Sequence, residues 1–211
     1  MKKISFMVIG IALMLIAGQV GAATTFTQNE FITAESLDQG KTQTGVHFSL
    51  GDDYKSYYPA IRYGLGGLFE VGVKFGIVTD IKPDNKNGAL LGADLKYQLI
   101  KQTEGVPVDM AVDLGYESTM ITKNDGKKTA NELKFSTVFS RGFPLTDRGY
   151  KFTPYGGLQV SLLSGSYLAN NDTNYYVFGG LEWKISQQFM ALLELKAGAT
   201  TIGGVGLRFE F

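Results

Sequence analysis

Residues 201–211 read TIGGVGLRFEF, a stretch in which apolar and polar side chains alternate up to the aromatic C-terminus. Side chains of a β-strand point alternately to its two faces. One face of this segment therefore holds a purely apolar set: Val205, Leu207, Phe209 and Phe211. The other face carries Arg208 and Glu210. The pattern predicts a strand with one apolar face and one charged face.

The same two-residue period recurs toward the N-terminus, in short runs separated by Gly, Asn, Asp and Pro. The predicted strands are residues 41–50, 55–65, 68–79, 88–100, 106–118, 131–141, 150–163, 173–185, 187–197 and 201–211. Most are close to the roughly 9–11 residues that a tilted strand needs to cross a bilayer. We expect an all-β fold, an antiparallel up-and-down transmembrane β-barrel of about ten strands, with eight or twelve as alternatives.

The aromatic residues decide between a membrane barrel and a soluble β-sandwich, because both alternate apolar and polar side chains. If consecutive strands run in opposite directions, the apolar-face aromatics form two bands. The band nearer the chain termini holds Tyr63, Phe69, Tyr97, Phe139, Phe152, Trp183, Phe189, Phe209 and Phe211. The opposite band holds Tyr57, Tyr116 and Tyr175. Two girdles flanking an aliphatic band match the two interfaces of a bilayer.

The last strand, ending on Phe211, resembles the assembly signal of bacterial outer-membrane proteins. The run FTPYGG at 152–157 is similar to a strand start common among small outer-membrane barrels. The resemblance indicates the superfamily of small bacterial outer-membrane β-barrels but no subfamily. It implies that the insertion machinery of the outer membrane reads the last strand, through Val205, Leu207, Phe209 and Phe211. We therefore expect a monomer in the outer membrane of a Gram-negative cell, in contact with outer-membrane lipid and lipopolysaccharide.

The N-terminus reads as a secretory signal over residues 1–22. Lys2 and Lys3 precede an apolar run at 4–17, and the small residues of Val20-Gly21-Ala22 follow as a cleavage pattern. Residues 23–40 do not alternate cleanly, so a periplasmic tail is favoured there over a short plug helix or an extra strand. Residues 41–211 are expected to form the barrel.

Composition excludes several other classes of protein. The 211 residues contain no Cys, so neither a disulfide framework nor a lipoprotein anchor can form. Removing Lys2 and Lys3 from the 20 basic residues leaves 18, against 20 acidic residues. This balance does not favour a nucleic-acid partner. No long apolar segment follows the signal, which excludes a helical membrane protein.

The connections between the predicted strands alternate in length. Residues 64–67, 101–105 and 184–188 are short, whereas 80–88, 120–130 and 164–172 are longer and rich in Asn, Asp, Lys and Gly. Short periplasmic turns and longer external loops are typical of outer-membrane barrels. Residues 142–149 depart from this rule, because this connection lies on the side of the short turns but is eight residues long. An even number of strands places both ends of the chain in the periplasm.

The face opposite the apolar one is dense with charge of both signs. The predicted lumen-lining residues are Arg62, Glu70, Lys74, Asp94, Lys96, Asp109, Asp113, Glu117, Glu132, Lys134, Glu182, Lys184, Glu194, Lys196, Arg208 and Glu210. In a wide barrel these groups would set the selectivity of a polar channel. A narrow barrel would instead be filled by them as an ion-pair network, and the small strand number favours this second interpretation.

Three functions are consistent with such a barrel. The leading hypothesis is a non-enzymatic protein that acts structurally or as a narrow passive pore for small solutes. The first alternative is surface binding or adhesion through the three longer loops. The second is an outer-membrane hydrolase that uses the only histidine, His47, oriented by Asp52, Asp53 or Asp80. We expect no catalytic residue, cofactor or metal in the leading case.

Overall fold

A computed structural model describes residues 28–82, 86–123, 126–145, 150–168 and 171–211. The signal peptide predicted for residues 1–22 lies outside this part of the chain. Within it, no helix is long and apolar enough to cross a membrane.

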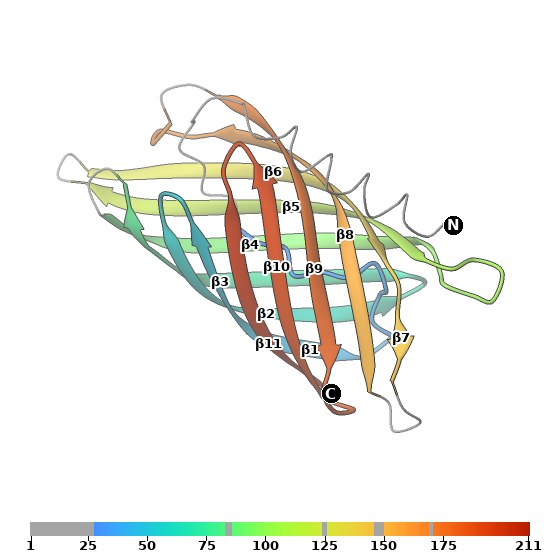
Figure 1. Ribbon diagram of the computed structural model, residues 1–211. Helices are drawn as coiled ribbons and strands as arrows, with labels where there is room; N and C mark the ends of the chain where they lie inside the picture. The colour runs from blue at the N-terminus through green and yellow to red at the C-terminus, as the bar shows by residue number, and fades with distance from the viewer. Residues whose placement is uncertain (1–27, 83–85, 124–125, 146–149, 169–170) are drawn as a thin grey trace.

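The described residues form one antiparallel sheet. Its strands are β1 (Thr42–Gly51), β2 (Lys55–Gly66), β3 (Phe69–Ile81), β4 (Lys86–Ile100), β5 (Asp109–Lys123), β6 (Gly126–Ser140), β7 (Phe143–Pro144), β8 (Lys151–Ser164), β9 (Asp172–Lys184), β10 (Phe189–Gly198) and β11 (Ile202–Glu210). Each long strand pairs with the next, β6 pairs with β8, and β1 pairs with β11 (Figure 1). The short β7 pairs with β8 only at one end. The ten long strands therefore close a barrel, which confirms the predicted fold.

The barrel closes where the first and last strands meet. Val46 lies opposite Leu207, and β1 and β11 pair along their length. Thr42 and Phe211 each donate a backbone hydrogen bond to the other's carbonyl, both at 2.9 Å. The aromatic C-terminus is thereby tied to the start of β1. Closure leaves neither strand with an unpaired edge, which would otherwise be exposed inside a bilayer.

The tight turn between β2 and β3 shows why glycine is needed there. Gly66, Gly67 and Leu68 have φ values of +88°, +58° and +74°, in the left-handed region that glycine adopts most readily. The register of β2 and β3 also shifts between Gly64 and Gly66. These features turn the chain sharply at the barrel end that carries Thr42 and Phe211. We call this end the terminal end and the opposite end the loop end.

The predicted contrast in loop length holds for the connection between β8 and β9, which runs from Ser164 to Asp172, but is wrong between β5 and β6. β5 and β6 stay paired as far as Lys123 and Gly126, so most of the 120–130 connection is strand. Only residues 52–54 and 199–201 separate the strands at two other loop-end connections. The strands continue because Ile121 and Ala130 point inward and are buried in a shared apolar cluster. Residues of turn-type composition therefore extend these two strands, which weakens the adhesion alternative.

Residues 28–34 are buried inside the barrel, not in a tail outside it. Followed from β1 toward the N-terminus, the chain turns at residues 38–41 and enters the lumen from the terminal end. This placement corrects the tail favoured for residues 23–40, as far as the chain is described. The physical reason is space and polarity: a ten-stranded interior is wider than one that side chains fill alone, and its charges need partners. We call residues 28–37 the lumen segment.

Candidate functional site: the plugged lumen

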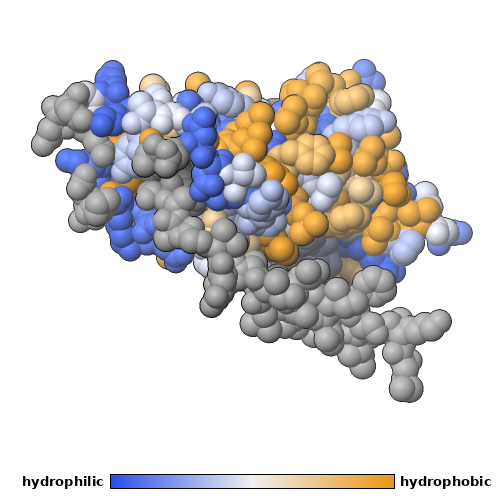
Figure 2. Space-filling model, turned by 90° about the horizontal axis from the view of Figure 1, so that it is seen from above, coloured by the Kyte–Doolittle hydropathy of each residue, from blue (hydrophilic) through white to orange (hydrophobic). Residues whose placement is uncertain are grey.

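The outer surface of the barrel is apolar around its middle. Val205, Leu207, Phe209 and Phe211 are all exposed, as the alternation predicts. Phe69 and Tyr97 stack on the outside near the terminal end, with ring centroids 4.5 Å apart, and Phe48 and Tyr57 lie 4.9 Å apart on the far side of the aliphatic region. Figure 2 shows the apolar side chains as an orange band, with a hydrophilic loop end at the left of the view.

The predicted lumen residues point inward. Twelve are buried: Arg62, Glu70, Lys74, Lys96, Asp109, Asp113, Glu117, Glu132, Lys134, Glu194, Lys196 and Arg208. Four are less buried: Asp94, Glu182, Lys184 and Glu210. The last three line a polar cavity of 170 Å³ at the terminal end. The alternation that places Arg208 and Glu210 on the inner face and Phe209 on the outer face of the last strand thus holds for the other strands of the barrel.

One ion-pair network occupies the middle of the lumen. Glu117 on β5 pairs with Lys74 on β3 and with Lys134 on β6. The Nζ of Lys134 also lies 2.8 Å from Oε1 of Glu30, a residue of the lumen segment. The same carboxylate oxygen lies 3.1 Å from Nζ of Lys196 on β10. Glu30 therefore joins strands on separate sides of the barrel.

A second network lies nearer the terminal end. Arg62 on β2 pairs with Glu70 and, at 2.5 Å, with Asp94. Glu70 also forms an ion pair with Lys96, whose Nζ lies 2.9 Å from Oε2 of Glu70. These side chains bridge β2, β3 and β4 across the inner face. Buried charges need such partners, because an unpaired charge in a low-dielectric interior is strongly destabilising.

The lumen segment completes these networks through its own backbone. Glu194 accepts hydrogen bonds from the amides of Glu30 and Phe31, at 2.8 and 2.7 Å. Lys96 donates to the carbonyls of Thr33 and Glu35, at 3.1 and 2.8 Å. Barrel side chains therefore replace the water that would otherwise hydrate this extended segment.

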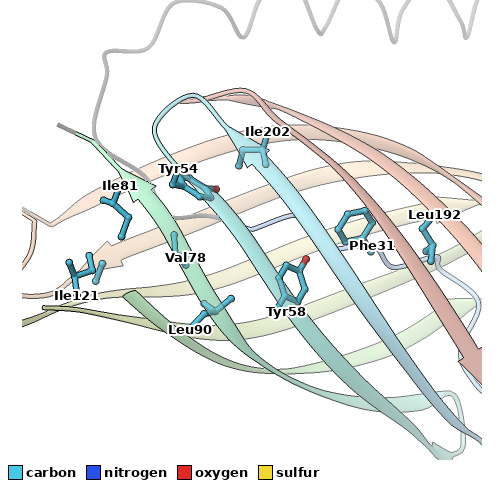
Figure 3. Close-up of a cluster of buried hydrophobic side chains, with 10 residues drawn as sticks. Phe31, Tyr54, Tyr58, Val78, Ile81, Leu90, Ile121, Leu192 and Ile202 are labelled. Carbon is cyan, nitrogen blue, oxygen red and sulfur yellow. The ribbon is translucent and has the colours of Figure 1, made fainter. Parts of the chain in front are cut away.

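An apolar layer fills the lumen toward the loop end. Tyr54, Val78, Ile81, Ile121 and Ile202 are buried there and belong to one cluster (Figure 3). Phe31 of the lumen segment joins the same cluster, together with Tyr58 and Leu192. Along the barrel the described lumen thus holds, in series, an apolar layer into which Phe31 packs, the lumen segment and two charged networks.

An apolar outer band, a closed antiparallel sheet and a charged interior meet the requirements of a bilayer. Lipid offers no hydrogen-bond partners, so only a closed barrel can cross it with strands. Single-chain antiparallel barrels with an even number of strands and an outward apolar band are the outer-membrane class. The chain has the fold of an outer-membrane β-barrel.

Solved structures with a similar fold are also barrels. The N-terminal β-barrel domain of OprF from Pseudomonas aeruginosa is 17% identical, with a TM-score of 0.42, covering 83% of this chain and 100% of that one. An outer membrane channel from Pseudomonas putida F1 is 10% identical, with a TM-score of 0.45, covering 89% and 100%. The translocator domain of the autotransporter NalP from Neisseria meningitidis is 12% identical, with a TM-score of 0.41, covering 84% and 91%. The sequence matches no protein-family model and shows no significant similarity to a curated protein.

His47 does not lie where the hydrolase hypothesis needs it. Its ring is buried in the lumen between Phe31 and Tyr58, with centroid distances of 4.8 and 5.2 Å. Its Nδ1 has no hydrogen-bond partner within the described part of the chain. Two of the three acidic residues proposed to orient it are engaged elsewhere, since Asp80 pairs with Lys55 at 2.8 Å and Asp52 accepts from Thr200 at 3.0 Å. No metal-binding cluster occurs among the described residues.

Sequence reasoning missed the residues of the lumen segment. Glu30 and Phe31 are central to the lumen, yet residues 28–37 carry no strand-like alternation that would assign them a face. Their nearest contacts include Glu194, 164 and 163 positions away along the chain. A local pattern cannot report such a contact. The one available signal was the pair of glutamates in a short segment preceding a barrel rich in inward lysines.

Proposed function

We propose that the protein is a non-enzymatic outer-membrane barrel whose lumen is closed at rest, so that it acts structurally or passes small solutes only slowly. The observation that supports this most directly is the buried lumen segment, with Glu30 between Lys134 and Lys196. A closed lumen removes the solvated path that a general porin needs. The ion pairs serve to fill and stabilise the interior.

Conductance tests this proposal. The full chain, folded and reconstituted into planar bilayers, is expected to show only small or rare current steps. A general porin reconstituted in the same bilayers provides the positive control, and heat-modifiable migration on gels establishes that the barrel has folded. Frequent steps as large as those of the porin would overturn the proposal.

We further propose that the outer apolar band contacts outer-membrane lipid and lipopolysaccharide, that the barrel is a monomer, and that the insertion machinery reads its last strand. The support for the last point is the exposed apolar side of β11, which Phe211 directly follows. That side chain remains exposed even though its backbone is paired with Thr42. An exposed terminal aromatic is available to a receptor before the barrel closes.

Phe211→Ala is expected to slow assembly into vesicles that contain the insertion machinery several-fold, while leaving spontaneous folding in detergent nearly unchanged. Phe143→Ala is the matched control, because Phe143 is also an exposed aromatic at the terminal end but lies in the short β7. The measurement is the rate at which heat-modifiable protein appears. Equal assembly rates for the two variants would contradict the assigned role of Phe211.

A further inference from the structure

The lumen segment is held mainly by hydrogen bonds between its backbone and single side chains of the barrel. Four further contacts repeat the pattern described for Glu194 and Lys96: Ala34 N to Ser140 Oγ at 3.0 Å, Ser36 N to Gln98 Oε1 at 3.0 Å, Leu37 N to Glu70 Oε2 at 3.0 Å, and Tyr58 Oη to Asn29 O at 2.9 Å. No described residue of the segment belongs to a strand. Water can replace contacts of this kind one by one, unlike a strand ladder, so the segment can leave without opening the barrel wall.

The segment also carries conformational strain at one of its deeply buried residues. Phe31 has a φ of +49°, in the left-handed region that costs a bulky residue roughly 1–3 kcal/mol. Its ring is almost fully buried, stacked on His47 and packed into the apolar cluster. Its departure relieves that strain and vacates the space of a buried aromatic ring.

A hinge is present where the segment leaves the barrel wall. Gly40 has a φ of +79° and open space where a Cβ would lie, and its amide donates to the carbonyl of Gly64 at 2.9 Å. Beyond this point Lys41 leads directly into β1. The turn lies at the terminal end, so a change of backbone angles there would move the segment out through that mouth.

One side chain holds the segment in the centre. Glu30 is the only residue of the lumen segment whose carboxylate is shown pairing with two buried lysines, Lys134 and Lys196. Glu35, the other glutamate of the segment, is 45% exposed and pairs with Lys151 at the mouth. Removing one partner of a buried ion pair costs far more folding free energy than removing one partner of an exposed pair.

We propose that the lumen segment is a displaceable gate: Glu30 locks it between Lys134 and Lys196, and when it swings out about Gly40 the barrel conducts small hydrated ions. This inference rests on the proposed function, because a gate requires a lumen that is closed at rest. The structural or slow-pore role is then the locked state of a conditional channel.

Charge reversal at the lock is the first test. Glu30→Lys places a third ammonium group beside Lys134 and Lys196, so the full-length variant in planar bilayers is expected to be open more than about tenfold more often than the wild type. Glu35→Lys is the control with the same charge change in the same segment, and it is expected to behave like the wild type. Folding of each variant is established by heat-modifiable migration. A folded Glu30→Lys variant with wild-type conductance would overturn the gate.

A disulfide lock provides the second test and does not depend on the folding of the charge-reversal variant. The natural chain has no cysteine, and Ala34 N lies 3.0 Å from Ser140 Oγ, so Ala34→Cys with Ser140→Cys joins the segment to β6. With both cysteines added to Glu30→Gln, the reduced protein is expected to open and the oxidised protein to remain closed. The two single-cysteine variants should not respond to oxidation.

The outcomes separate the two proposals. Large conductance in the oxidised, locked protein would refute both the gate and the closed resting lumen. Negligible conductance in the oxidised and reduced proteins alike, once a gel shift shows that the disulfide has formed and been broken, would refute the gate and leave the closed lumen standing. Opening only on reduction supports both.

Discussion

Lys134→Met is expected to lower the free energy of unfolding of the barrel by roughly 3 kcal/mol, at the low end of the range for breaking a buried ion pair. Lys134 is 1% exposed and pairs with both Glu117 and Glu30. Its loss leaves two carboxylates buried with one fewer cation. The effect stays at the low end because Glu117 retains Lys74 and Glu30 retains Lys196.

Unfolding in urea or guanidinium, followed in phospholipid vesicles, measures this change. Lys184→Met is the matched control, because Lys184 is also an inward lysine but is 25% exposed and lies 3.8 Å from Glu210. Its replacement is expected to change the free energy of unfolding by less than about 1 kcal/mol, as for a surface pair. If the two variants were equally stable, the central network would not contribute as the geometry indicates.

Leu207→Arg is expected to destabilise the barrel by roughly 2–4 kcal/mol, the cost of a basic side chain near the bilayer midplane. Leu207 is 47% exposed on the outer face, between Val205 and Phe209 along β11. Its cross-strand neighbours are Val46 and Ala191, which are also apolar. The guanidinium group would therefore lie among lipid tails with no acidic partner on the adjacent strands.

The depth dependence of this cost provides its control. Leu65 is an exposed leucine at the terminal end of β2, next to the turn at Gly66 and Gly67. Leu65→Arg is expected to cost about 1 kcal/mol or less, because the arginine reaches the interface. Both variants are measured by unfolding in vesicles and again in detergent micelles. Equal costs for Leu207→Arg and Leu65→Arg in vesicles would argue against the assigned position of the apolar band.

The faces of the strands could be read from the sequence because they depend on a local period. Alternation alone put Leu207 and Phe209 outside and Arg208 inside, and the register around the barrel agrees. The strand positions followed for the same reason. The ends of β5 and β6 did not, because Lys123 and Gly126 lie in a stretch whose composition suits a loop equally well.

The position of the lumen segment could not be read in this way. Residues 28–37 have no period, and their partners on β3, β4, β6 and β10 are brought together only when the barrel closes. Sequence alternation therefore determined the membrane-facing wall and which charges point inward. Only the tertiary structure decided that Glu30 fills the space between Lys134 and Lys196, because a buried charge takes the partner that the closed barrel places beside it.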